Sequence, residues 1–277
     1  AIIQGYPMII DKSDEPTRRH GIAFDHPIFH WYNKHLKRKQ VVEFLVNTYH
    51  VSEREARKAM IQGEKASKAF HDELMNAGRR VIESLRGTER FAVVLSGRPY
   101  HSDELVNHNL ARHFTKMRIP VLTLDSLPDL HKQDLTHARM EAFNPFHTRM
   151  LSASLAVGSD PNLELAQIVS FGCGHDAIIS DEMSRLLRAK SNKELLVIKL
   201  DEGDAQGPMN IRVKSFIETI RAKRESGGLP ESDKELNEAY EVKFTKKDKK
   251  VRKILAPNLS PAFCKIITAA IESEGYE

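Results

Sequence analysis

The amino-acid sequence predicts an α/β fold: a mostly parallel sheet with helices on both faces, preceded by a helical connector and followed by a C-terminal helical tail. Four short, mostly apolar runs have the length of strands, and the run at residues 91–95 has the continuous apolar character of a parallel strand that is covered on both sides. A segment with helical spacing follows each run, and strands that alternate with helices pair in parallel through right-handed connections. The four predicted strands are residues 91–95, 120–124, 166–170 and 195–200.

The first 88 residues divide into two predicted parts. Residues 1–29 open with an apolar run typical of the end of a buried element, and residues 11–27 have the proline, glycine and charge content of a loop. We interpret residues 1–29 as the remnant of an upstream α/β lobe. Residues 30–88 predict a connector of two helices. The longer helix begins at a capping box formed by Ser52 and Glu55 and ends at Gly87.

Residues 89–227 form the predicted α/β domain, which contains the turn SFGCG. Polar turns follow three of its strands, with the sequences SGRPYH, SFGCGHD and DEGDAQG. The helices between the strands are expected at about residues 105–116, 146–157, 177–188 and 211–220.

Residues 228–277 are predicted to form a basic segment and a final helix. Residues 243–253 (KFTKKDKKVRK) hold seven basic residues and one acidic residue. Both a nucleic-acid contact and a solvated basic face fit this composition. We favour the solvated face, with no specific nucleic-acid partner, because Phe244 is the only aromatic residue in the run. Ser260 and Pro261 predict the start of the last helix, in which Cys264 is assigned to the core.

The overall composition argues against a membrane-spanning protein and against a disulfide-rich protein. Of the 277 residues, 29% are charged and 40% are hydrophobic, the net charge is +4, and no apolar run approaches the roughly 20 residues that span a bilayer. Only two cysteines are present, far apart, which argues against a disulfide framework and favours the reducing cytoplasm. The chain begins at Ala1 rather than at a methionine, so we expect it to be a fragment of a longer protein.

The carboxyl ends of the predicted strands are the expected location of a site, because ligands gather there in open α/β sheets. Arg98 could bind an anionic group and His101 could transfer a proton near neutral pH. Arg98 has an alternative role, which is to cap a carbonyl or to pair with Asp201 or Glu202. The candidate residues at these strand ends are Arg98, Tyr100, His101, Cys173, His175, Asp176, Asp201 and Glu202.

Cys173 lies in a strand–glycine turn–helix segment, at the expected start of a helix. The positive end of a helix dipole stabilises a thiolate, so Cys173 is either a reactive thiol or a buried, inert cysteine. The chain contains no Walker motif, no GxGxxG after a strand, no GxSxG elbow and no HExxH helix.

Several ordered segments resemble the acyl-CoA dehydratase activase-related family, whose large members are called 2-hydroxyglutaryl-CoA dehydratase activators or CoA-substrate-specific enzyme activases. The resemblance runs from about residue 5 to residue 224. The segments that carry it are VVLSGRPYHSDELVNHNLARHF, PVLTLDSLPD, NPFHTRMLSASLAV, PNLELAQIVSFGCGHDAIISDEM and LLVIKLDEGDAQGPMNIRVKSFIETI. The loop DEGDAQGPMN departs from the small-residue run that is usual in the family.

The resemblance implies α/β lobes like those of the cluster-bearing dehydratase subunits, which enclose an iron–sulfur cluster, with 4Fe–4S as the working expectation. Cys173 would be one ligand, and the other cysteines would lie upstream of this chain. Two cysteines fall short of the four that a cluster needs, so we expect no cluster bound to this fragment. The family motif also covers Arg98, Tyr100, His101, Asn107 and His108.

Three functions follow from these observations. The leading hypothesis is a fragment of an iron–sulfur protein of the 2-hydroxyacyl-CoA dehydratase/activase system, inactive alone, in ATP-driven low-potential electron transfer to a CoA thioester or another small molecule. Its partners would be upstream ATPase activase domains or a dehydratase-type subunit. The alternative is a non-catalytic domain that binds CoA-like anions or docks a subunit. The third hypothesis is a hydrolase or transferase, but the sequence contains no nucleophile–base motif that would support it.

Overall fold

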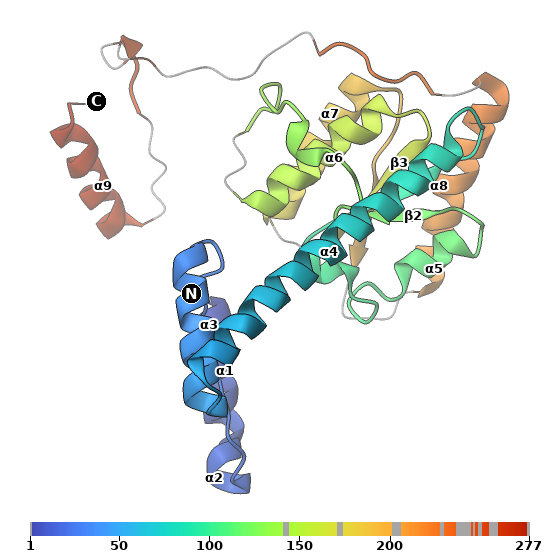
Figure 1. Ribbon diagram of the computed structural model, residues 1–277. Coiled ribbons are helices and arrows are strands. Elements are labelled where there is room, and N and C mark those ends of the chain that lie inside the picture. The colour runs from blue at the N-terminus through green and yellow to red at the C-terminus, as the bar shows by residue number, and fades with distance from the viewer. Residues whose placement is uncertain are drawn as a thin grey trace. The chain divides into compact units, whose positions relative to one another are not determined.

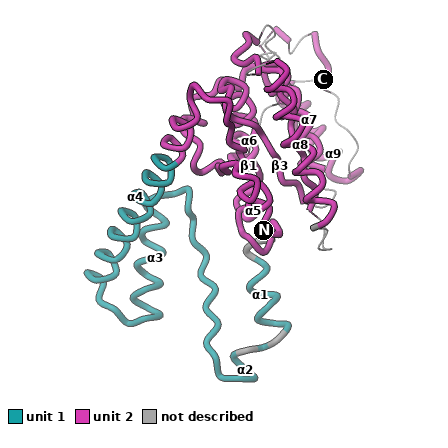
Figure 2. The backbone as a smooth tube through the Cα atoms, turned by 90° about the vertical axis from the view of Figure 1, so that its right-hand side faces the viewer, with its two compact units in different colours: residues 1–77 teal, residues 78–277 magenta. Residues whose placement is uncertain are grey.

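The computed structural model describes residues 2–140, 144–170, 174–200, 206–227, 230–236, 245, 247–248, 251–254 and 260–275. The chain divides into two units, residues 1–77 and 78–277, which are coloured separately in Figure 2. The division falls inside the longest helix, α4 (Glu53–Leu85), whose last turns belong to the second unit.

The first unit is helical and contains α1 (Ile2–Asp14), α2 (Pro16–His20), α3 (Lys34–Tyr49) and the first part of α4. The predicted capping box of α4 is present. The backbone N–H of Glu55 donates to Ser52 Oγ at 3.3 Å, and the N–H of Ser52 donates to the Glu55 carboxylate at 3.1 Å. The Glu64 carboxylate of α4 forms ion pairs with Lys37 and Arg38 of α3, at 3.1 and 2.5 Å. Hydrogen bonds from Arg38 and Lys37 lower the pKa of Glu64 to about 2.

The N-terminal segment differs from its prediction in two ways. The apolar run is an exposed helix instead of the end of a buried element, since Tyr6, Met8 and Ile9 are 56–60% exposed. Residues 11–20 are largely helical instead of a loop, because α1 continues to Asp14 and α2 follows at once. Proline has the backbone angle of a first helical position, and Gly21 ends α2 in the left-handed conformation (φ 63°). Pro16 and Gly21 therefore mark the two ends of α2, whereas Pro7 lies inside α1.

The second unit is built on a four-stranded parallel sheet in the order β2-β1-β3-β4, which confirms the predicted fold class. The strands are β1 (Ala92–Ser96), β2 (Val121–Thr123), β3 (Leu163–Ser170) and β4 (Leu196–Leu200), so each predicted run forms a strand. The pairing register aligns Val94 with Leu122 on one side and with Leu165 on the other. Every residue of β3 is buried, including the polar Glu164, Gln167 and Ser170.

Helices cover both faces of this sheet (Figure 1). On one face, α6 (Pro145–Ser159) and α7 (Gly174–Lys190) pack together with the last turns of α4, where Leu85 is completely buried. On the other face lie α5 (Leu110–Thr115) and α8 (Gln206–Gly227), whose Phe114 and Ile217 are fully buried. The two apolar cores are separated by the sheet, so they hold its strand ends in fixed positions.

Two predicted helices differ in detail. The helix expected from residue 105 begins only at Leu110, because His108 and Asn109 have positive φ angles (51° and 58°) that a helix does not accept. The last helix, α9 (Pro261–Ser273), starts where predicted, but the Ser260 side chain makes no capping hydrogen bond. Cys264 is half-buried instead of part of the core, since α9 buries none of its residues. Within the described residues, no helix is long and apolar enough to cross a membrane.

Candidate site at the carboxyl ends of β1 and β3

The strand order creates a topological switch point between β1 and β3. The chain leaves β1 through α5 towards β2, and it leaves β3 through α7 towards β4, in the opposite direction along the sheet. The two connections also run over opposite faces. Loops that diverge in this way leave an opening at the carboxyl ends of the strands, which is the usual ligand site of an open α/β sheet.

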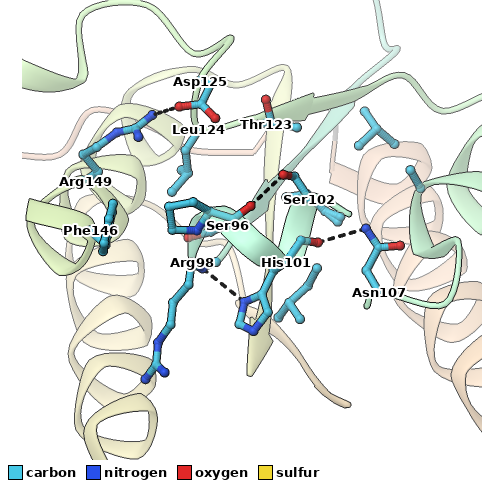
Figure 3. Close-up of a pocket in the computed structure, with 16 residues that line it drawn as sticks. Ser96, Arg98, His101, Ser102, Asn107, Thr123, Leu124, Asp125, Phe146 and Arg149 are labelled. Carbon is cyan, nitrogen blue, oxygen red and sulfur yellow. Dashed lines mark hydrogen bonds and ion pairs between the residues drawn. The ribbon is translucent and has the colours of Figure 1, made fainter. Parts of the chain in front are cut away.

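The loop after β1 is folded tightly around His101. Arg98 donates its backbone N–H to His101 Nδ1 at 3.1 Å, and residues Pro99–Ser102 form a short 3-10 helix. A Cβ atom on Gly97 would lie 2.6 Å from His101 Nδ1, so only glycine admits the ring at this position. Asn107 donates to the His101 carbonyl at 2.9 Å and accepts the N–H of Leu110, which joins this loop to α5 (Figure 3).

The hydrogen bonds of His101 define its tautomer. Because Nδ1 accepts the Arg98 N–H, the neutral ring carries its proton on Nε2, which donates to Ser170 Oγ at 2.6 Å. Burial lowers the pKa of His101 to about 4; the charge of Asp176 opposes this shift and that of Arg98 adds to it. His101 therefore has no lone pair facing Ser170 and does not act as its general base in this arrangement. This geometry argues against a hydrolase built on Ser170 and His101.

Asp176 joins the ends of both strands. Its Oδ1 receives Arg98 Nη2 at 2.7 Å, and its Oδ2 accepts the backbone N–H of Ser170 at 3.2 Å. Asp176 lies in the first turn of α7, where the helix dipole stabilises a carboxylate, and it is only 3% exposed. Asp176 is thus one ion-pair partner of Arg98, and the predicted partners Asp201 and Glu202 lie outside the described residues, so that pairing stays a prediction.

Tyr100 and two histidines surround this ion pair. Tyr100 Oη accepts from Arg98 Nη1 at 3.3 Å and lies 3.4 Å from Ser170 Oγ. The exposed His175 packs edge-on against His147 of α6, with ring centroids 5.9 Å apart. Burial and the charges of Arg98 and His175 lower the pKa of His147. The structure therefore brings together five predicted residues, Arg98, Tyr100, His101, His175 and Asp176, with Asn107 as a support.

Three further residues of the site were not predicted. Ser170 and His147 contact the predicted residues directly, and Arg149 pairs with Asp125 at 2.7 Å on the far side of a cavity of about 90 Å³. His147 and Arg149 occur in the segment NPFHTRM, whose proline marks the start of a helix. This proline is the sequence signal that could have placed both residues near the strand ends. The predicted His108 is half-buried and does not line this cavity.

The cavity itself lies between the carboxyl ends of β1 and β2 (Figure 3). Arg98, Asn107 and Arg149 are part of its lining. Ser96 also belongs to the lining, and its Oγ is enclosed by protein without a hydrogen-bond partner among the described residues. An orphaned hydroxyl of this kind is typical of a place where a ligand group or an ordered water completes the hydrogen bonding.

Cys173, the predicted metal ligand, lies outside the described residues, so its role stays a prediction. The residues on either side of its segment are described: Ser170 ends β3 and Gly174 begins α7. Both flanks are joined to Arg98 through the carboxylate of Asp176. No group of three or more histidine, cysteine, aspartate or glutamate side chains within the described part of the chain has the geometry of a metal site.

The fold and the site define an open-sheet α/β protein with a charged, hydrogen-bonded cluster at its switch point and a small cavity beside it. Residues 1–127 of the 277 match the family described as CoA enzyme activase uncharacterised domain. The match confirms the resemblance to the CoA-substrate-specific enzyme activases. It includes Arg98, His101 and Asn107 but ends before Ser170 and Asp176. No curated protein and no solved structure shows significant similarity to the chain.

Proposed function

We propose that this chain is part of an iron–sulfur protein of the 2-hydroxyacyl-CoA dehydratase/activase system, acting in the cytoplasm. The protein would take part in ATP-driven, low-potential electron transfer to a CoA thioester or another small molecule. The match of residues 1–127 to the activase-related domain supports the system to which the chain is assigned. ATPase activase domains or a dehydratase-type subunit are the proposed partners.

The observation that carries the proposal is the position of the SFGCG segment. Its described flanks are Ser170, at the carboxyl end of β3, and Gly174, at the start of α7, and Asp176 contacts both Arg98 and the backbone N–H of Ser170. A nearby cation and a helix start are the two features that favour a cysteine thiolate, and both occur at these flanks. We assign Cys173 as a ligand of the cluster and Arg98 and Asp176 as residues that position its segment.

The residues of this chain do not by themselves fit a complete cluster. Iron–sulfur clusters require four ligands, usually thiolates, and the sequence contains only Cys173 and Cys264. No metal-binding group occurs among the described residues. Cys173 would therefore supply one ligand of the cluster, and the other ligands would come from residues outside this sequence.

A second candidate function is the binding of a CoA-like anion without catalysis. The cavity beside Ser96 supports it, because two arginines, Arg98 and Arg149, line one small space. A volume of about 90 Å³ accommodates a single phosphate- or carboxylate-sized group, not a whole cofactor.

Anaerobic reconstitution of the full-length protein with iron and sulfide distinguishes the two functions. We expect a cluster absorption spectrum and bound iron in the wild type, loss of both in Cys173→Ser, and no change in Cys264→Ser, the matched control. An unchanged cluster in Cys173→Ser would overturn the ligand assignment. Binding of CoA by a protein that takes up no cluster would favour the second function, and isothermal titration calorimetry measures it.

A further inference from the structure

A second, larger cavity lies at the opposite edge of the sheet, where the strands begin. Its volume is about 530 Å³, within the range typical of small-molecule sites. Three elements form its wall: the segment before β1, the turn between α5 and β2, and the last turns of α8. Four arginines line it against two glutamates, Glu89 and Glu225; the arginines are Arg90, Arg118, Arg221 and Arg224.

Two of these arginines are held rigidly by the fold. Arg224 is buried, donates to the Pro161 carbonyl at 2.7 Å and pairs with Glu164 at 2.9 Å. Its guanidinium also lies over the Phe91 ring, 4.9 Å from the centroid. Arg221 donates to Glu218 and to the Met117 carbonyl, at 2.7 and 3.3 Å. These contacts fix two guanidinium groups in the wall of the cavity, each of them paired with a glutamate.

The other two arginines are not committed to the fold. Arg90 and Arg118 are exposed, and neither guanidinium has a hydrogen-bond or ion-pair partner among the residues that the structure describes. Arg224 Nε adds an unsatisfied donor, since it is buried without a partner in the same set of residues. Arg118 also has a left-handed backbone (φ 61°), a conformation in which glycine is favoured over arginine. The local backbone therefore does not account for an arginine at position 118.

We propose that this cavity binds a small polyanion that carries two adjacent phosphate groups. Guanidinium groups match phosphate oxygens in paired hydrogen bonds, and four of them exceed what a single carboxylate needs. The uncompensated charge comes from the exposed Arg90 and Arg118, whereas Arg221 and Arg224, each paired with a glutamate, add guanidinium groups in fixed positions. The concave shape fits a small molecule better than a flat partner surface. The site is independent of the strand-end pocket and of the proposed cluster.

Calorimetric titration of the full chain with inorganic pyrophosphate tests this proposal. Loss of one charged hydrogen-bonding group should weaken binding by about tenfold or more, so Arg118→Gly and Arg90→Gln should each show this loss. Arg118→Gly also relieves the left-handed backbone, so its effect on binding is separable from a failure to fold. The matched control is Arg112→Gln, which removes an exposed arginine of the same unit that pairs with Glu104 outside the cavity.

Orthophosphate and ADP complete the experiment. Orthophosphate should bind more weakly than pyrophosphate; ADP binding at least as tight as pyrophosphate identifies a nucleotide-type ligand, and weaker ADP binding identifies a free diphosphate. Absence of pyrophosphate binding at millimolar concentration would overturn the proposal. Equal losses in Arg118→Gly and Arg112→Gln would overturn it too, because they indicate non-specific attraction.

Discussion

Substitution of Gly97 by alanine tests whether the packing of His101 holds the candidate site together. The new Cβ would lie 2.6 Å from Nδ1 and 3.1 Å from Cβ of His101, and side-chain carbons do not approach other atoms so closely. The ring must therefore move, which breaks the Arg98–His101 hydrogen bond of 3.1 Å and the His101–Ser170 hydrogen bond of 2.6 Å. Overpacking and the two lost hydrogen bonds together should lower the free energy of unfolding by about 2–4 kcal/mol.

Urea denaturation followed by circular dichroism measures this loss. Gly207→Ala is the matched control, because Gly207 lies in the first turn of α8 in the same unit and an added Cβ there meets no atom within 4 Å. We expect the control to differ from the wild type by less than about 0.5 kcal/mol. A similarly small effect of Gly97→Ala would refute the claim that His101 occupies the space left by the missing side chain.

Two further predictions concern the ionisable groups of the site. His101 has a pKa of about 4, below the ordinary value of 6.5, so the unfolded chain binds more protons between these values. The stability that its neutral form contributes should be complete above pH 6.5 and decrease as the pH falls towards 4; NMR titration of the ring with an apparent pKa near 6.5 would contradict this. For Asp176 and Arg98, a double-mutant cycle of neutral variants should give a coupling free energy of about 1 kcal/mol or more, because the carboxylate is buried. The exposed pair Glu104–Arg112 is the control and should give about 0.5 kcal/mol or less, and equal values for the two pairs would exclude a special role for Asp176.

The sheet was predictable because its signal is local. A parallel strand covered on both faces is rich in apolar residues, and the runs that became β1 and β3 are mostly apolar; Glu164, Gln167 and Ser170 of β3 are polar and buried as well. Helix ends depend on backbone angles that composition does not determine. His108 and Asn109 adopt left-handed angles through their tertiary context, so the helix α5 is shorter than its periodicity indicated.

The site was predictable in its location but not in its pairing. Arg98, His101 and Asp176 follow strands, and the carboxyl ends of parallel strands meet at one edge of the sheet. Which residues pair depends on register and loop conformation: the contacts from Arg98 to Asp176 and from His101 to Ser170 join residues 78 and 69 positions apart. Ser170 escaped prediction because a serine at a strand end carries no signal until the histidine that faces it is placed.

The central claim, that Cys173 is a ligand of an iron–sulfur cluster, is tested most directly by alkylation of the two cysteines in the anaerobically prepared full-length protein. Thiolate ligands of iron react slowly with iodoacetamide, whereas a free thiol reacts readily. The half-buried Cys264 serves as the internal control. Our account predicts, by mass spectrometry, that Cys173 is protected until iron is removed with a chelator, while the labelling of Cys264 does not change. Equal labelling of Cys173 before and after iron removal would contradict it.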